Sequence, residues 1–366
     1  MSFKLKIIYL DNSATTKPYA EVVSAMSECM TFFYGNPSSL HRLGFEAEKA
    51  VKKARESVAK RLAVAPETVY FTSGGTESNN TAIFGAYRSG KVITTPIEHK
   101  SVLEPMKRLG CAEFASVNKD GTVSLESLES LIDKDTTLVS VMHVNNETGA
   151  VQPISEIKKI IKEKAPRALF HVDAVQSFCK IPIPENTADL ISVSAHKIHG
   201  PKGVGALYVR RGIRLNPHIL GGGQEKGVRS GTENVPGIVG FGKACEKVND
   251  FSHVEKLGAI LRERLENIKI NGCGMPYILN VAYPGIRSEI IVHALEAKGV
   301  MVSSGSACSS SKASYVLEAM GLPKGYPDSS IRISLSAENT EDEIITATDI
   351  INETIRDLKR QLRIKD

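Results

Sequence analysis

Chemically capable side chains stand at the ends of β-branched runs that are typical of buried strands. Asp173 ends one such run, Gln176 follows it by one helical turn, and Lys197 ends the tetrapeptide Ser194-Ala195-His196-Lys197 after another run. In open α/β sheets, ligands bind beyond the carboxyl ends of the strands, so we expect these residues to share one site. Simpler explanations exist, since Asp173 could merely cap a helix and most lysines are solvated. A lysine buried at a strand end, however, is costly unless it is paired or used covalently.

A glycine-rich turn, Ser73-Gly74-Gly75-Thr76, precedes a predicted helix and adds a second kind of site. Backbone N–H groups and a hydroxyl at a helix N-terminus can bind a phosphate. By itself the turn is a weak signal, because a glycine turn capped by Thr76 is as often a plain connection between strand and helix. Together with Asp173 and Lys197 it meets the needs of pyridoxal phosphate, which are a phosphate site, an acid for the pyridinium nitrogen and an amine for the aldehyde.

The surrounding pattern predicts the elements that position these residues. Residues 45–210 alternate amphipathic helices with short β-branched runs, which is typical of an α/β domain around a mainly parallel sheet. The remainder predicts a smaller α+β domain, so we expect a large domain of residues 15–250 and a small domain of residues 1–14 with 251–366. The predicted strands are 68–72, 91–95, 137–143, 168–173, 190–194, 205–209, 278–282 and 331–334, and the predicted helices include 46–62, 76–87, 100–109, 154–164, 238–268, 288–298 and one from Glu341.

Composition indicates an ordinary soluble globular protein. The 366 residues, 42% of them hydrophobic and 24% charged, suffice for about two domains that each bury a core. The formal net charge of +5 is spread along the chain, so direct nucleic-acid binding is not indicated. No apolar run approaches the roughly 18 residues of a membrane helix, and the N-terminus lacks the apolar core of a secretory signal. These features predict a cytoplasmic protein without membrane contact.

Six cysteines lie far apart in the chain and form no Cys-x-x-Cys pair. Neither a disulfide framework nor a zinc site is indicated, and we expect no bound metal. Cys29 and Cys245 occur in helical patterns, where a buried thiol behaves as a small apolar residue. Cys308 differs, because it ends the run Ser303-Ser304-Gly305-Ser306-Ala307-Cys308 of small residues. The full set is Cys29, Cys111, Cys179, Cys245, Cys273 and Cys308.

A set of motifs that spans nearly the whole chain resembles the NifS/IscS-type cysteine desulfurases, in the class V aminotransferase group of fold-type I pyridoxal-phosphate enzymes. The resemblance implies their fold, with a large domain around a mainly parallel seven-stranded sheet plus a smaller α+β domain. The motifs are YLDNSATT (9–16), GNPSS (35–39), TSGGTESNN (72–80), EHK (98–100), HVNNETG (143–149), HVDAVQ (171–176), SAHK (194–197), GVRSGT (227–232), SSGSAC (303–308) and IRIS (331–334).

The resemblance also implies roles for individual residues. Lys197 resembles the lysine that binds the cofactor covalently, and Asp173 resembles the partner of the pyridinium nitrogen. Gln176 resembles a donor to the phenolic oxygen, and His99 resembles a catalytic ring stacked on the cofactor. Further cofactor-binding residues implied in this way are Gly75, Thr76, Asn146, Ser194, His196 and, from the second subunit of a homodimer, Thr232.

On the substrate side of the site, the resemblance implies a guanidinium group that binds a carboxylate. Arg332, with Asn36 and Asn146, resembles the grip on the substrate α-carboxylate, a task that suits a planar bidentate group. The implied reaction converts L-cysteine to L-alanine. The thiolate of Cys308 takes the sulfur as a persulfide and transfers it to an acceptor, such as an iron–sulfur scaffold or another thiolation protein.

Three alternatives to this function remain. A class V aminotransferase is disfavoured by Cys308, because that reaction needs no such thiol. A cofactor-free scaffold protein is disfavoured because Lys197, Asp173, Gln176 and His99 are all retained. A selenocysteine lyase stays open, and so does the identity of the sulfur acceptor.

Overall fold

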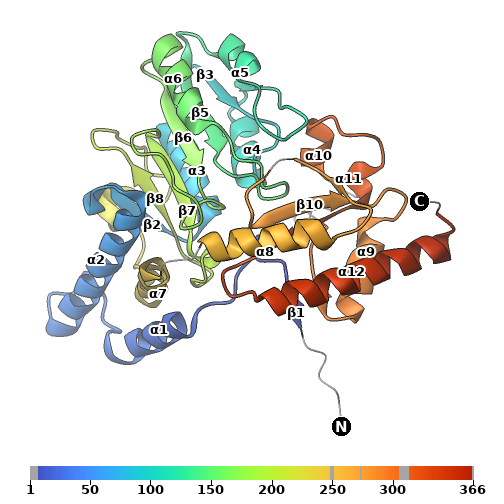
Figure 1. The fold of residues 1–366 in the computed structure, drawn as a ribbon. Helices are drawn as coiled ribbons and strands as arrows, with labels where there is room; N and C mark the ends of the chain where they lie inside the picture. Colours follow the sequence, from blue (N-terminus) through green and yellow to red (C-terminus); the bar gives the residue numbers. More distant parts are fainter. Residues whose placement is uncertain (1–6, 248–250, 273, 305–312, 365–366) are drawn as a thin grey trace.

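The structure is a computed structural model, and it describes residues 7–247, 251–272, 274–304 and 313–364. Figure 1 shows a larger part built around one long sheet, beside a smaller part made mostly of C-terminal elements. The strands of the larger part are β2 (Val69–Thr72), β3 (Lys91–Thr94), β4 (Ala112–Phe114), β5 (Thr136–Met142), β6 (Leu169–Asp173), β7 (Leu190–Ser194) and β8 (Gly205–Val209). Its helices are α1 (Ala20–Phe32), α2 (Arg42–Leu62), α3 (Gly75–Ala86), α4 (Lys100–Arg108), α5 (Leu125–Leu131), α6 (Ile154–Lys164) and α7 (Val235–Glu246).

The seven strands lie in the order β2-β8-β7-β6-β5-β3-β4, and β8 alone runs antiparallel to its neighbours. This confirms the predicted mainly parallel seven-stranded sheet. The central strands are buried along nearly their whole length because helices cover both faces, as is usual for parallel sheets. The sequence analysis missed β4, a half-exposed edge strand of three residues without a β-branched side chain.

The continuous helix predicted over residues 238–268 is wrong. Two helices lie there, α7 and α8 (Phe251–Arg264), because Lys247 has extended backbone angles of φ −71° and ψ 132° that end α7. Each of the two helices buries one apolar face, so the helical periodicity of apolar residues continues from one helix into the next in the sequence. Gly242 lets α7 pack directly on α2, since a Cβ there would lie 2.6 Å from the Cα of Ala54.

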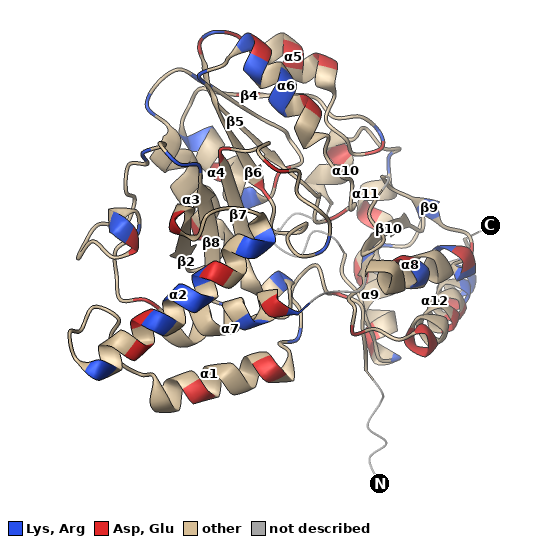
Figure 2. Ribbon diagram, turned by 60° about the vertical axis from the view of Figure 1, so that its left-hand side comes forward, with Lys and Arg blue, Asp and Glu red and all other residues tan. Residues whose placement is uncertain are grey.

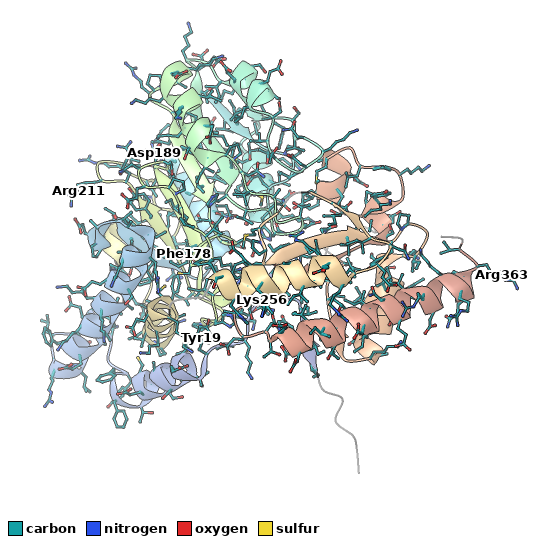
Figure 3. All side chains as sticks on the ribbon, in the orientation of Figure 1. Tyr19, Phe178, Asp189, Arg211, Lys256 and Arg363 are labelled. Atoms are coloured by element: carbon teal, nitrogen blue, oxygen red, sulfur yellow. The ribbon has the colours of Figure 1, made fainter. Side chains whose placement is uncertain are left out.

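The interior of the larger part is apolar and includes aromatic side chains. Phe178, labelled in Figure 3, packs edge-to-face on Phe241 of α7, with 6.1 Å between the ring centroids. Phe241 also meets Phe71 of β2 edge-on at 6.5 Å. These contacts fix α7 against the sheet and the turn that follows β6, which is the turn that carries Gln176.

The smaller part has an antiparallel sheet in the order β12-β10-β9 and a cluster of buried apolar residues of its own. Residues near the start of the chain join it, because β1 pairs in parallel with β11. The domain limits, residues 15–250 against 1–14 with 251–366, stay a prediction. The elements are β1 (Ile8–Tyr9), β9 (Lys269–Ile270), β10 (Ile278–Ala282), β11 (Val300–Met301), β12 (Ser330–Ser334), α8, α9 (Ser288–Ala297), α10 (Tyr315–Ala319), α11 (Tyr326–Ser329) and α12 (Glu341–Leu362).

Charged residues of both signs alternate over the outer helices, for example along α2 and α12 (Figure 2). The charged residues at the ends of α12 complement the helix dipole, with Glu341 and Asp342 in its first turn and Lys359 and Arg360 in its last. Within the described ranges, no helix combines the length and the apolar character that crossing a bilayer requires.

Candidate active site

A cavity of about 310 Å³ opens where β5, β6 and β7 end. The last residues of these strands, Met142, Asp173 and Ser194, line it together with the first turns of α3 and α4, and β12 of the smaller part contributes one arginine. The cavity thus lies at the carboxyl ends of the parallel strands, where the sequence analysis expects the site. The predicted site residues that line it are Gly75, Thr76, His99, Asn146, Asp173, Gln176, Ser194, His196, Lys197 and Arg332.

Three predicted site residues do not line this cavity. Asn36 is exposed between α1 and α2, and its Oδ1 accepts the Ser38 backbone N–H at 2.9 Å. Thr232 is exposed before α7, beside a smaller hollow. Cys308 lies outside the described residues. A single chain therefore leaves Asn36 and Thr232 away from the cavity, and their roles stay predictions.

The N-terminus of α3 packs tightly against the loops after β6 and β7. A Cβ on Gly75 would lie 2.8 Å from Val175 Cγ2 and 3.7 Å from the Cβ of Ser194. Because nothing larger than glycine fits, the unpaired N–H groups of the first helical turn come close to both strand ends. This is the geometry that an anion at a helix N-terminus requires.

Four buried polar atoms around this cavity have no hydrogen-bond partner among the described residues. They are Asn79 Oδ1, Asn146 Oδ1, Ser194 Oγ and Arg332 Nε. Proteins pair nearly all buried polar atoms, so a group of unpaired ones around a single cavity indicates that a polar ligand belongs there. The donor set fits pyridoxal phosphate, since an acid, an amine and a helix N-terminus line the same space.

A continuous hydrogen-bond chain joins Asp173 to His99. The Asn79 side chain donates from Nδ2 to Asp173 Oδ2 and to Ser101 Oγ, both at 2.8 Å, and Ser101 Oγ lies 2.7 Å from His99 Nδ1. The Val175 N–H donates to the other carboxylate oxygen of Asp173 at 3.0 Å. Every group between the acid and the imidazole is therefore fixed by at least one partner.

His99 is a neutral imidazole in this arrangement. Burial lowers its pKa, and the nearby Lys197 also lowers it, although the charge of Asp173 acts in the opposite direction. Nδ1 accepts the backbone N–H of Ser101 at 3.1 Å, so the proton of the neutral ring is on Nε2. The sequence predicts no individual role for Asn79 or Ser101. Asn79 could have been found, because it lies one helical turn after Thr76 on α3.

Two backbone carbonyls of the N-terminal segment hold the lysine. Lys197 is in the short 3₁₀ turn after β7, and its Nζ donates to the carbonyl oxygens of Ser13 at 2.6 Å and Ala14 at 2.8 Å. The Ser13 oxygen also accepts Nε2 of Gln176 at 2.9 Å. Next to the lysine, burial lowers the pKa of His196 to about 3, with help from the charges of Lys197 and others, so this ring is neutral too.

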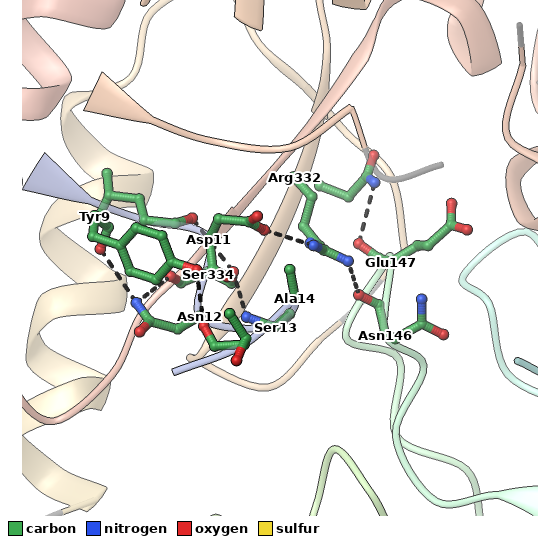
Figure 4. A network of polar contacts seen from close by, with 12 residues as sticks. Tyr9, Asp11, Asn12, Ser13, Ala14, Asn146, Glu147, Arg332 and Ser334 are labelled. Carbon is green, nitrogen blue, oxygen red and sulfur yellow. Dashed lines mark hydrogen bonds and ion pairs between the residues drawn. The ribbon is translucent and has the colours of Figure 1, made fainter. Parts of the chain in front are cut away.

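Arg332 reaches the cavity from β12 and is almost completely buried. Figure 4 shows its two contacts, with Nη1 donating to the Asn146 carbonyl oxygen at 2.9 Å and Nη2 donating to Asp11 Oδ1 at 2.7 Å. The remaining donor, Nε, has no hydrogen-bond partner within the described ranges. Asp11, which the sequence analysis did not single out, therefore orients the guanidinium by an ion pair.

The described residues on both sides of Cys308 contact the cavity wall. Ser303 exchanges two backbone hydrogen bonds with Arg332, at 3.1 and 2.7 Å. Ser314, the N-cap of α10, donates from Oγ to Glu147 Oε2 at 2.5 Å. Burial raises the pKa of Glu147 to about 7, although Ser314 and Arg332 act in the opposite direction.

Known proteins resemble this chain in sequence. The aminotransferase class-V family model matches residues 8–346. The chain belongs to this family. A cysteine desulfurase of Trichormus azollae is 44% identical over 97% of this chain and 94% of its own length. Cysteine desulfurase IscS of Dictyoglomus turgidum is 40% identical over 96% and 95%.

Solved structures also resemble this chain. A NifS-like protein superimposes with a TM-score of 0.90 at 42% identity, covering 96% of this chain and 99% of that one. The structure of SspA in complex with cysteine gives 0.81 at 34% identity, covering 91% and 99%. The resemblance to NifS/IscS-type proteins and the fold-type I architecture are thereby confirmed.

Two of the described cysteines are core residues. Cys29 and Cys245 are buried, which confirms their predicted place in the core. Cys29, Cys111, Cys179 and Cys245 form no disulfide bond among the described residues. No group of three His, Cys, Asp or Glu side chains suited to a metal ion occurs among the residues that the structure describes.

Proposed function

We propose that this member of the aminotransferase class-V family is a pyridoxal-phosphate-dependent cysteine desulfurase, which converts L-cysteine to L-alanine and carries the sulfur on Cys308. The observation that carries the proposal is the cavity in which Lys197, Asp173 and Gln176 meet beside four unpaired polar atoms. The names of the relatives support the substrate, since they are cysteine desulfurases and one neighbouring structure holds cysteine.

The residues of the larger part would hold the cofactor. Lys197 would bind its aldehyde, Asp173 its ring nitrogen and Gln176 its phenolic oxygen. The phosphate would lie at the N-terminus of α3, where Thr76, Ser194 and His196 offer donors. When bound, pyridoxal phosphate supplies an electron sink that makes the Cα proton of an amino acid removable.

The chain supplies the groups that bind and move protons. Arg332 binds the substrate carboxylate, because its buried guanidinium is oriented by Asp11 and Asn146 and retains Nε as a donor. Lys197 takes the Cα proton as general base. His99, whose Nε2 carries the proton, offers a hydrogen-bond donor close to the reacting atoms.

Cys308 accepts the sulfur in this proposal. Its thiolate attacks the sulfur of the substrate, so an S–S bond forms while the bond from Cβ to sulfur breaks and its electron pair stays with carbon. Protonation of that carbon and return of a proton from Lys197 to Cα give alanine, and a persulfide remains on Cys308. A free thiol has a pKa of about 8.5, so proton removal must be assisted at neutral pH. The contacts of Ser303 with Arg332 and of Ser314 with Glu147 support action of this segment at the cavity.

We also propose a homodimer in which Asn36 and Thr232 complete the site of the other subunit. Large apolar side chains are exposed beside both residues, and such groups mark contact surfaces. They are Phe32, Tyr34, Leu40 and Phe45 near Asn36, and Leu220 near Thr232. Light scattering should give twice the chain mass. A fully active monomer would remove both residues from the site.

The sulfur acceptor is proposed to be an iron–sulfur scaffold or another thiolation protein of the cytoplasm. Bacterial relatives such as that of Dictyoglomus turgidum support this assignment, although a relative from Candida maltosa is mitochondrial. No described contact favours selenocysteine over cysteine.

Turnover of L-cysteine by the cofactor-loaded protein tests the proposed function. With a thiol reductant present, alanine and sulfide should appear in equal amounts. Transfer of the amino group to a 2-oxo acid without sulfide would instead indicate an aminotransferase. Protein that retains no pyridoxal phosphate after loading would indicate a scaffold, and either result would overturn the proposal.

A further inference from the structure

Lys180 is a buried lysine next to the proposed site, in the turn that follows β6. Its side chain is only 6% exposed, and its Nζ donates to Gln176 Oε1 at 3.3 Å. The ring of Tyr277 lies below it, with 6.0 Å between Nζ and the ring centroid. A buried ammonium group is costly unless a carboxylate pairs with it. No ion pair of Lys180 occurs among the residues that the structure describes, so another reason for its position is required.

The surroundings of Lys180 are cationic. Burial and the charges of Lys197 and Arg332 lower its pKa to about 7, and the Cys179 thiol is the one group that acts in the opposite direction. His199 faces it as well and is itself a base whose pKa burial lowers. An apolar side chain would cost less free energy than an amine at this buried position. The hydrogen bond to Gln176 is therefore the feature that explains the amine.

The amide of Gln176 is held at both ends. Nε2 donates to the carbonyl oxygen of Ser13 at 2.9 Å, and Oε1 accepts from Lys180. The orientation follows from chemistry, because the carbonyl oxygen of Ser13 only accepts and therefore faces Nε2, which leaves Oε1 toward the Lys180 amine. One N–H of the amide is used by Ser13, and the other remains for the cavity that Gln176 lines.

We propose that Lys180 is a positioning residue, which holds Oε1 of Gln176 away from the cavity so that the amide presents an N–H to the phenolic oxygen of the cofactor. A phenolate oxygen only accepts hydrogen bonds, so a reversed amide would face it with a second acceptor. The inference rests on the proposed function, because Gln176 meets a phenolic oxygen only if pyridoxal phosphate occupies the cavity. Lys180 itself touches neither substrate nor cofactor in this role.

Replacement of Lys180 by methionine tests the inference, since methionine keeps the length and removes the donor. The dissociation constant for pyridoxal phosphate should rise roughly 5- to 30-fold, the effect of losing one oriented hydrogen bond. The pH at which the absorption of the bound cofactor changes should move upward, because the ionised phenolic oxygen loses a donor. A purely structural role would not move this pH.

Matched variants separate the hydrogen bond from other effects. Lys180→Gln retains a donor and should recover most of the affinity. Lys158→Met removes a lysine that bonds to Asp189, beyond the opposite end of β7, and should leave the cofactor spectrum unchanged. In a Gln176→Leu background, Lys180→Met should add nothing, because residues that act through one contact are not additive.

The outcomes are distinct from those of the proposed function. If the unaltered protein binds no pyridoxal phosphate, the proposed function fails. If it binds and Lys180→Met has the same affinity and spectrum, or weakens binding equally in the Gln176→Leu background, the inference about Lys180 is overturned. Circular dichroism checks folding, and Lys180→Leu replaces Lys180→Met in every comparison if the latter does not fold.

Discussion

The two walls of the cavity are built in different ways. On the wall formed by β6, α3, α4 and the turn after β7, a continuous chain of hydrogen bonds joins Asp173 through Asn79 and Ser101 to His99. On the same wall, the carbonyl oxygens of Ser13 and Ala14 hold Lys197. On the facing wall, Arg332 and Glu147 each depend on a few contacts with distant segments, such as Asp11 and Ser314. The first wall is preorganised for a resident group, whereas the second can exchange its partners when a substrate arrives. We therefore expect changes in the two walls to have different signatures.

The largest effect is expected on the preorganised wall. Lys197→Ala removes the amine that is held by the Ser13 and Ala14 carbonyls, so turnover of L-cysteine should fall by several powers of ten. Borohydride treatment and peptide mapping should attach the cofactor to Lys197 in the unaltered protein and to no residue in the variant. Lys202→Ala, an exposed lysine of the same loop, is the control and should behave normally. Attachment to another lysine would contradict the assignment.

The substrate wall should respond in substrate affinity alone. Arg332→Lys replaces the bidentate fork by a single ammonium, and KM for L-cysteine should rise about 10- to 100-fold, as expected for the loss of a charge-assisted hydrogen bond. The affinity for pyridoxal phosphate should stay nearly constant. The control is Arg356→Lys, at an exposed ion pair with Glu266. Equal losses of cofactor and substrate affinity would break the distinction between the two walls.

A prediction of another kind concerns pH and stability on the substrate wall. Burial raises the pKa of Glu147 to about 7 from its ordinary value of 4.5, so folding favours the neutral acid. Its contribution therefore becomes destabilising as pH rises from about 4.5 to 7 and stays so above pH 7, by an amount of about 3 kcal/mol. Glu147→Gln should remove this dependence. Urea unfolding of both proteins at pH 4.5 and 8 measures it, and a difference that does not change with pH would contradict the prediction.

The parts of the fold that the sequence predicts are those with a strong repeating pattern. The runs that form β6 and β7 are mostly apolar and β-branched, as buried parallel strands require, and the predicted bounds agree with the structure to within a residue. The short edge strand β4 lacks such a pattern, and the break between α7 and α8 depends on the backbone at Lys247 rather than on periodicity.

The candidate site divides in the same way. Asp173 and Lys197 could be predicted because a charged side chain at the end of an apolar strand is unusual. The carbonyl oxygens of Ser13 and Ala14 could not, since a backbone acceptor leaves no mark in residue type. Lys180 was missed for a third reason, because only the fold shows that this lysine of a turn is buried.

The central claim is that Cys308 accepts the sulfur, and Cys308→Ala tests it most directly. Cofactor binding through Lys197 and the spectral response to L-cysteine should persist, because the thiol acts only after the substrate has bound. Alanine and sulfide formation should fall by several powers of ten, since no nucleophile remains to take the sulfur.

Mass spectrometry of the unaltered protein after brief reaction with L-cysteine completes this test. A mass increase of one sulfur atom should be found on the peptide that contains Cys308, and Cys111→Ser and Cys273→Ser should each retain substantial activity. Near-normal alanine production by Cys308→Ala, or a persulfide on Cys111 or Cys273, would contradict the account.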